Sequence, residues 1–155
     1  MLRLNDPSVI AALLVEAGGK EESIDAVVEH DEFGWTVTFD DGATCVVRMA
    51  STPARLVLSG SVGQPAPDCM AELHALALSF NLLVHETGGC RIARGEDEEL
   101  VLVQELSTDS LDEGDLAGHL MGFEVLRALW EHIVVSHQSP PKPAELMNLV
   151  NGIKA

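Results

Sequence analysis

The stretch from Met70 to Val84 constrains this chain most, because it predicts a helix with two separate apolar faces. At about 100° per residue, its apolar residues divide into two groups that point in different directions, with polar residues between them. One group consists of Leu73, Leu76, Ala77, Phe80, Leu83 and Val84. The other consists of Ala71, Ala75, Leu78 and Leu82. The chain's own sheet can cover one face, so the second face needs another helix of the chain or a second copy of the protein.

Length and charge limit the possible architectures and partners. A chain of 155 residues suits one domain with a substantial core. We expect that domain over residues 1–136, followed by a Pro-rich break and a short amphipathic segment over residues 137–155. With 25 acidic against 9 basic residues the net charge is −16, which disfavours nucleic acid and anionic membranes as partners. An acidic body can also hold a partner with apolar surface without aggregating.

The composition predicts a cytoplasmic protein without a membrane span. No run approaches the roughly 18 consecutive apolar residues that a spanning helix needs. The first ten residues have no basic region leading into an apolar run, so we expect no secretory signal. The cysteines Cys45, Cys69 and Cys90 are odd in number and widely spaced, which favours reduced thiols over a disulfide framework.

The first fifty residues predict a helix followed by strands. A cap at Asn5 or Asp6 predicts a helix over Pro7–Ala17 that ends at Gly18-Gly19. The segment Ile24–His30 alternates weakly between apolar and polar residues and is predicted as a strand.

The clearest hairpin joins Trp35–Phe39 to Ala43–Met49. A two-residue turn would place Thr44 and Arg48 on the apolar face of the first strand. A three-residue loop from Asp40 to Gly42, with its glycine left-handed at a bulge, avoids this mixture. We therefore expect one apolar face, made of Trp35, Val37, Phe39, Ala43, Cys45, Val47 and Met49.

The rest of the chain alternates between strands and helices. Arg55–Val62 is predicted as a strand with Leu56 and Leu58 pointing inward. Asp68 is expected to cap the helix with two faces, which ends near His85. The later elements expected are a strand at Cys90–Arg94, a central strand covered on both faces at Glu99–Glu105, a helix from Asp112 to about Val134, and a short amphipathic stretch at Ala144–Ile153.

Motifs that carry catalytic chemistry are weak or missing. His85-Glu86 begins like a zinc-protease motif but lacks the second histidine. Together with Cys90 it leaves a small enzyme or metalloprotein as a rival interpretation. The segment from Gly60 to Gly63 lacks the remaining positions of a phosphate-binding loop, and no serine has the context of a hydrolase nucleophile. We therefore expect no catalytic residue, no metal and no cofactor.

The predicted elements follow the order helix, three strands, helix, two or more strands, helix. The stretches that carry this order are WTVTFDDGATCVV, RLVLSGSVGQP, LHALALSFNLL, GGCRIARGEDEELVLVQEL and GHLMGFEVLRALWEHIV, which cover most of Trp35 to Val134. In a small acidic chain, this order resembles the class I type III secretion chaperones, the CesT-type family of bacterial effector chaperones.

The resemblance implies an α+β fold and a function without catalysis. The fold would be a twisted antiparallel sheet of five to six strands with three main helices, in the order α-β-β-β-α-β-β-α, dimeric through the second helix. The function would be that of an ATP-independent chaperone, which binds the N-terminal region of type III secreted effectors in extended form and keeps them competent for export. The alternative is a non-catalytic dimeric regulatory or scaffold module of the same fold that binds a folded partner.

The resemblance also implies partners and the surfaces that bind them. The partners would be the effector, a second copy of the chain and, as a further candidate, the secretion ATPase. The dimer face would consist of Ala71, Ala75, Leu78 and Leu82. Effector contacts would come from Ile10, Leu13 and Leu14 on the first helix and from Val46 and Val57 on the strands. If Leu116, Phe123 and Trp130 of the last long helix cover the second face instead, the dimer must form elsewhere.

Overall fold

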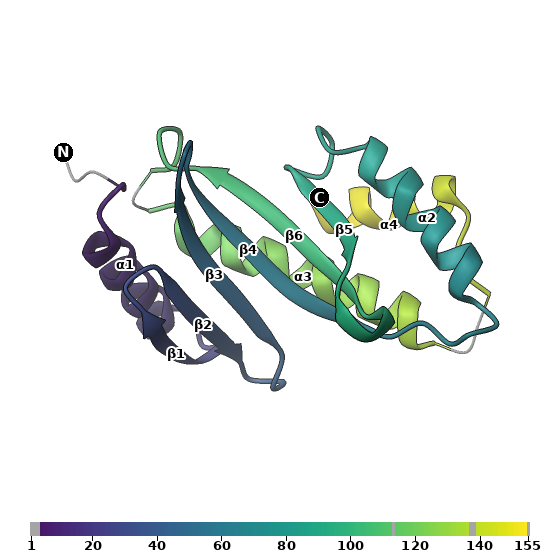
Figure 1. Cartoon of the computed structure of the whole chain (residues 1–155), viewed down its shortest axis with the longest axis horizontal. Coiled ribbons are helices and arrows are strands. Elements are labelled where there is room, and N and C mark those ends of the chain that lie inside the picture. The colour runs from purple at the N-terminus through teal and green to yellow at the C-terminus, as the bar shows by residue number, and fades with distance from the viewer. Residues whose placement is uncertain (1–3, 113, 137–138, 155) are drawn as a thin grey trace. The chain divides into compact units, whose positions relative to one another are not determined.

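The computed structural model describes residues 4–112, 114–136 and 139–154, and the fold is α+β (Figure 1). Six strands form one antiparallel sheet in the order β1-β2-β3-β4-β6-β5. The elements are α1 (Pro7–Lys20), β1 (Ile24–Asp31), β2 (Gly34–Phe39), β3 (Thr44–Ser51), β4 (Ala54–Gly63), α2 (Met70–Leu82), β5 (Cys90–Arg94), β6 (Leu100–Ser107), α3 (Leu116–Val135) and α4 (Pro143–Lys154), with a short 3-10 turn, η1, at Glu96–Glu98. Four strands precede α2 rather than three, because the weakly alternating segment Ile24–Asp31 pairs with β2.

The chain divides into two compact units. The first comprises Met1–Gly60 and Glu105–Phe123, and the second comprises Ser61–Gln104 and Glu124–Ala155. The elements β4, β6 and α3 each run from one unit into the other. The expected division into a domain over residues 1–136 and a tail over residues 137–155 remains a prediction.

Helix α1 begins as the sequence predicts but ends later. The Asp6 carboxylate accepts a hydrogen bond of 2.9 Å from the Ser8 backbone N–H, and Pro7 occupies the first turn. The expected stop at Gly18-Gly19 is wrong. Neither glycine has the left-handed backbone that ends a helix, and the helix continues to Lys20, whose ammonium pairs with the Glu16 carboxylate one turn earlier.

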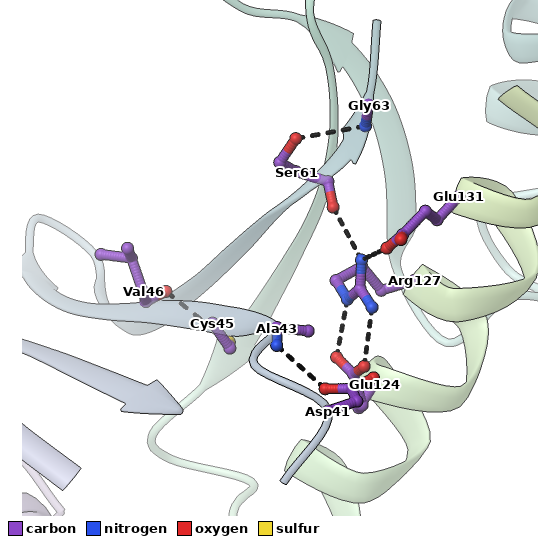
Figure 2. Close-up of polar contacts among 9 residues, drawn as sticks. All are labelled: Asp41, Ala43, Cys45, Val46, Ser61, Gly63, Glu124, Arg127 and Glu131. Carbon is purple, nitrogen blue, oxygen red and sulfur yellow. Dashed lines mark hydrogen bonds and ion pairs between the residues drawn. The ribbon is translucent and has the colours of Figure 1, made fainter. Parts of the chain in front are cut away.

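The hairpin of β2 and β3 has the predicted register. Trp35 lies opposite Val47, and Val37 lies opposite Cys45. The loop closes with a 2.9 Å hydrogen bond from the Gly42 N–H to the Phe39 carbonyl, and Gly42 has the left-handed φ of 84° that the bulge requires. The Asp41 carboxylate also accepts from the Ala43 N–H at 2.9 Å (Figure 2). Trp35, Val37, Phe39, Cys45 and Val47 are consequently all buried on one face.

Strand β4 adds to the same core. Leu56 and Leu58 are fully buried, as the sequence predicts, and β4 pairs with β3 through Leu58 opposite Val47. In the first unit α1 lies against β1, and its Ile10 and Leu14 are buried.

Helix α2 starts without the expected cap. Its N-cap residue is Cys69, and no side chain accepts from the free N–H groups of the first turn, so the prediction that Asp68 caps the helix is wrong. The physical reason is that the residue before the helix, Cys69, is itself in a right-handed helical conformation, which moves Asp68 one position too far out. The helix ends at Leu82, and the Leu83 N–H bonds to the Phe80 carbonyl.

The remaining elements of the second unit lie close to α2. Helix α4 contacts α2 and buries Leu146 and Val150 (Figure 1). In β6, Leu100, Leu102 and Gln104 are buried while Val101 and Val103 are only half-buried. The expectation that this strand is covered on both faces is therefore wrong for the single chain, because alternate side chains emerge on the more open face of the sheet.

Candidate functional site

The two faces of α2 have opposite environments. Leu73, Leu76, Ala77 and Phe80 are buried, and the Trp130 ring of α3 meets the Phe80 ring edge-on with a centroid distance of 5.1 Å. On the other face Leu78 is 72% exposed and Leu82 is 83% exposed. Ala71 and Ala75 are exposed beside them. No described residue of the chain covers this second face, which we call the open face of α2.

The Asn81 side chain anchors α2 to β5, the strand at one edge of the sheet. Its amide nitrogen donates to the Ile92 carbonyl at 2.9 Å, and its amide oxygen accepts from the Ile92 N–H at 2.7 Å. The side chain thus satisfies the outward-facing backbone groups of Ile92, as a neighbouring strand would. This contact holds one polar seam of α2 against β5. The sequence indicates only that polar residues separate the two apolar faces, and it does not predict this role, since nothing local to Asn81 reveals its partner.

A hollow of about 220 Å³ lies beside the open face of α2. Its lining consists of His74, Ala77, Leu78, Ile92, Ala93, Arg94 and Leu100. The His74 Nε2 atom is buried there without a hydrogen-bond partner among the described residues. A mostly apolar hollow beside an exposed leucine suits the packing of another apolar surface.

Arg127 forms the main buried charge of the second unit (Figure 2). Its guanidinium donates twice to the Glu124 carboxylate, at 2.7 and 2.8 Å, and once to the Ser61 carbonyl at 3.0 Å. It also pairs with Glu131. These carboxylates, Glu124 first, raise the pKa of Arg127 above its usual range, so the guanidinium stays charged. The cluster ties α3 to β4, and its sequence signal is an arginine on an apolar helix with glutamates three residues before and four after it.

The predicted partner-binding residues fall into two environments. Ile10 and Leu14 of α1 are fully buried in the first unit and present no surface, while Leu13 is half-buried. Val46 and Val57 are half-buried on neighbouring strands. They alternate with the buried core residues of β3 and β4, so the structure brings them to the opposite face of the sheet.

The residues of the rival enzyme interpretation do not form a site. His85 and Glu86 are exposed in the turns after α2, and Cys90 is buried at the start of β5. Within the ranges that the structure describes, no three His, Cys, Asp or Glu side chains are placed to hold a metal ion. Over the same ranges, no helix has the length and apolar character needed to cross a bilayer.

Comparison with known families and structures identifies similar proteins. The model of the Tir chaperone protein (CesT) family matches residues 23–123. No curated protein matches the sequence. A chain in the crystal structure of the ExsC–ExsE complex is similar with a TM-score of 0.69 and 17% identity, and the match covers 88% of this chain and 100% of that one.

Two further solved structures have the same fold. A chain of the HopA1–SchA chaperone–effector complex matches with a TM-score of 0.62 and 20% identity, over 81% of this chain and 95% of that one. The type III secretion chaperone SycH of Yersinia pestis, solved with a fragment of YscM2, matches with a TM-score of 0.58 and 20% identity, over 77% of this chain and 97% of that one. At these identities the similarity establishes the fold.

Proposed function

The chain belongs to the Tir chaperone protein (CesT) family of type III secretion chaperones, and on that premise we propose that two copies of it together bind the N-terminal region of a secreted effector. The effector segment lies in extended form across both copies and stays competent for export. The chaperone acts in the cytoplasm, needs neither ATP nor a cofactor, and catalyses no reaction. The secretion ATPase is the candidate receiver of the loaded complex.

Similar solved structures support the effector as a partner. One is a chaperone–effector complex, and another holds a type III secretion chaperone with a fragment of a second protein. The net charge of −16 supports the same function, because mutual repulsion keeps a complex soluble while it carries an unfolded apolar client.

The open face of α2 is the single observation that carries the proposal of a dimer. Two copies that meet there bury four leucine side chains, Leu78 and Leu82 from each, and each buried leucine contributes about 1.5–3 kcal/mol. Ala71 and Ala75 are small enough to let two helices approach closely. The hollow beside Leu78 offers space for a side chain of the second copy.

The client surface that we propose uses the apolar side chains that remain accessible. On the sheet these are Val46 and Val57, which are half-buried. On α1 they are Leu13, also half-buried, and Val15, which is 66% exposed. Ile10 and Leu14 support this surface indirectly, because their buried side chains anchor α1 to the core. A large surface with scattered apolar contacts suits an extended client.

Co-purification from the native bacterial lysate tests the function. The untagged complex is separated by size exclusion, its mass is measured by light scattering, and the bound partner is mapped by limited proteolysis. We expect two chaperone copies per effector and protection of one long N-terminal segment of the effector. A partner that is protected only as a folded globular domain would contradict the proposal and favour a scaffold module.

A further inference from the structure

The open face of α2 has its small and large side chains at opposite ends. Ala71 and Ala75 lie in the N-terminal half of the helix, and Leu78 and Leu82, which are 72% and 83% exposed, lie in the C-terminal half. At about 100° per residue all four fall within an arc of about 60°, so they form one row along the helix. A row in this order is complementary in size to its own reverse.

The direction in which a second copy of α2 meets this row decides how the side chains fit. In a parallel pair each residue meets its own equivalent, so alanine meets alanine at one end, leucine meets leucine at the other, and the helices splay apart. In an antiparallel pair, with the two-fold axis near the middle of the row, Leu78 meets the partner's Ala75, and Leu82 meets the partner's Ala71. Every layer then holds one large and one small side chain, and the helices stay evenly spaced.

Charge favours the antiparallel direction as well. Two copies with a net charge of −16 repel each other, but the four residues of the open face are uncharged. The acidic residue of the helix, Glu72, is exposed beside this face. A parallel pair places both Glu72 side chains at the same level, whereas the antiparallel pair separates them by about 13 Å along the helix axis. It also brings the positive N-terminal end of each helix beside the negative C-terminal end of the other.

The hollow beside α2 lies where the antiparallel pair needs space. His74 and Leu78 line it from α2, and residues 92–94 line it from β5, on the flank of the helix that Asn81 holds against β5. With the axis near the middle of the row, the partner's Leu78 comes to the level of residue 75, between His74 and Leu78. The volume of about 220 Å³ gives that leucine side chain room to pack. In the parallel pair, the partner's Leu78 lies on the opposite flank and cannot enter the hollow.

We propose that two copies of the chain pair through α2 in this antiparallel register. The partner's Leu78 packs over Ala75 and beside the hollow, and the partner's Leu82 packs over Ala71. The inference rests on the proposed function for the existence of the dimer, and it assigns the contacts that the dimer makes. Each copy supplies both the leucines that project and the alanines and hollow that receive them, as a two-fold interface requires.

A double-mutant cycle between positions 71 and 82 of the full chain tests this register. The two positions lie about 16 Å apart along the helix, so any energetic coupling between them arises across the interface. Leu82→Ala alone should weaken the dimer by at least about tenfold, because two layers lose a leucine. Ala71→Leu alone should weaken it by overfilling the same layers. The combined variant again has one large and one small side chain per layer, so its dissociation constant, measured by sedimentation equilibrium, should return to within about threefold of the unmodified value.

A variant of the same composition is the control. Ala75→Leu combined with Leu82→Ala also exchanges one alanine and one leucine, but position 75 meets the partner's Leu78 rather than position 82. Two layers are then overfilled and two are underfilled, so this dimer should be at least about tenfold weaker than that of the Ala71→Leu, Leu82→Ala variant. The substituted positions are exposed in the protomer, and circular dichroism checks that both variants keep its fold. Equal dissociation constants for the two combined variants, or no coupling between positions 71 and 82, would overturn the register.

The outcomes distinguish a failure of this proposal from a failure of the chaperone function. If the unmodified protein is a dimer without coupling between positions 71 and 82, the register is wrong and the dimeric chaperone stands. If the coupling is found but the protein captures no effector from the native lysate, the register stands and the chaperone function fails. A monomeric unmodified protein would contradict both the register and the proposed dimer.

Discussion

The two faces of α2 are both apolar in sequence but differ in environment. Leu73, Leu76 and Phe80 are at most 3% exposed, whereas Leu78 and Leu82 are exposed by more than two-thirds. The difference shows that periodicity determines which residues share a face, but the presence of covering elements determines which face is buried. One face is covered within the protomer and the other is not. Substitutions on the buried face should therefore affect folding, and substitutions on the open face should affect association.

The largest effect is expected for Leu78→Asp, which places a charge at the centre of the open face of α2. Two copies of an unpaired carboxylate would enter the proposed interface, so we expect a loss of more than about 3 kcal/mol in dimer stability and a monomer by light scattering. Val125→Asp, on an exposed apolar residue of α3, is the matched control and should leave the dimer intact. A persistent dimer in Leu78→Asp would place the interface elsewhere.

A substitution on the buried face of α2 should lower the folding stability of the protomer. Phe80→Ala removes a fully buried ring that packs against Trp130, and we expect it to lower the free energy of unfolding by about 3–5 kcal/mol. Urea denaturation measures this best in the Leu78→Asp background, where unfolding is not coupled to dimer dissociation. A loss below about 1 kcal/mol would mean that this face is less well packed than the structure indicates.

Arg127 tests stability at the contact between α3 and β4. Arg127→Met leaves the buried Glu124 carboxylate without its cation, and we expect it to lower the free energy of unfolding by about 3 kcal/mol without changing the oligomeric state. Replacing Glu124 by Met as well should recover much of that loss, because the uncompensated charge is gone. No recovery in the double variant would indicate that the hydrogen bond to Ser61 carries the stability instead.

Asn81→Ala removes the side-chain contact that holds α2 against β5. The Ile92 N–H and carbonyl lose their partner, and we expect about 2 kcal/mol less stability together with faster hydrogen exchange at the Ile92 amide. Asn81→Asp, which keeps an acceptor for the Ile92 N–H, should protect that amide better than alanine does. Unchanged exchange at Ile92 in the alanine variant would contradict the anchoring role.

The smallest effect is expected at Asp6, in the unit that does not contain α2. Its folded-state pKa is lowered, first by the Ser8 hydroxyl and then by the Ser8 backbone N–H, so its contribution to stability is present above the unfolded pKa of about 4. That contribution is lost as the pH falls through the folded pKa. Asp6→Asn retains a cap without a titrating group, so its helix should keep this contribution in acid. Identical pH profiles of unfolding for the two proteins would contradict this.

Local chemistry accounts for what could be predicted of the fold. The register of the hairpin follows from the alternation of Trp35, Val37 and Phe39 and from the one loop length that keeps their partners apolar. The start of α1 follows from Asp6 and Pro7 in the same way. The two wrong predictions both concern the ends of helices. Gly18 continues a helix and Asp68 does not cap one, because each depends on backbone conformations that neighbouring contacts impose.

Within the candidate site, too, some features could be predicted from local sequence and others depended on distant residues. The membership of the open face of α2, Ala71, Ala75, Leu78 and Leu82, could be read from helical geometry. The burial of Ile10 and Leu14 could not be distinguished from a binding role, since an apolar stripe on a helix can face either the core of the protein or a partner. The roles of Asn81 and Arg127 depend on Ile92 and Ser61, which lie 11 and 66 positions away.

The sequence by itself determined that α2 has two apolar faces, which residues belong to each, and that something must cover both. Only the tertiary structure decided that Phe80 faces Trp130 while Leu78 and Leu82 remain open. The physical reason is that periodicity is a property of the helix alone, whereas burial depends on which distant segments reach it. Asn81 illustrates the difference, because its position on the helix can be read from the sequence, whereas its two hydrogen bonds to Ile92 of β5 cannot.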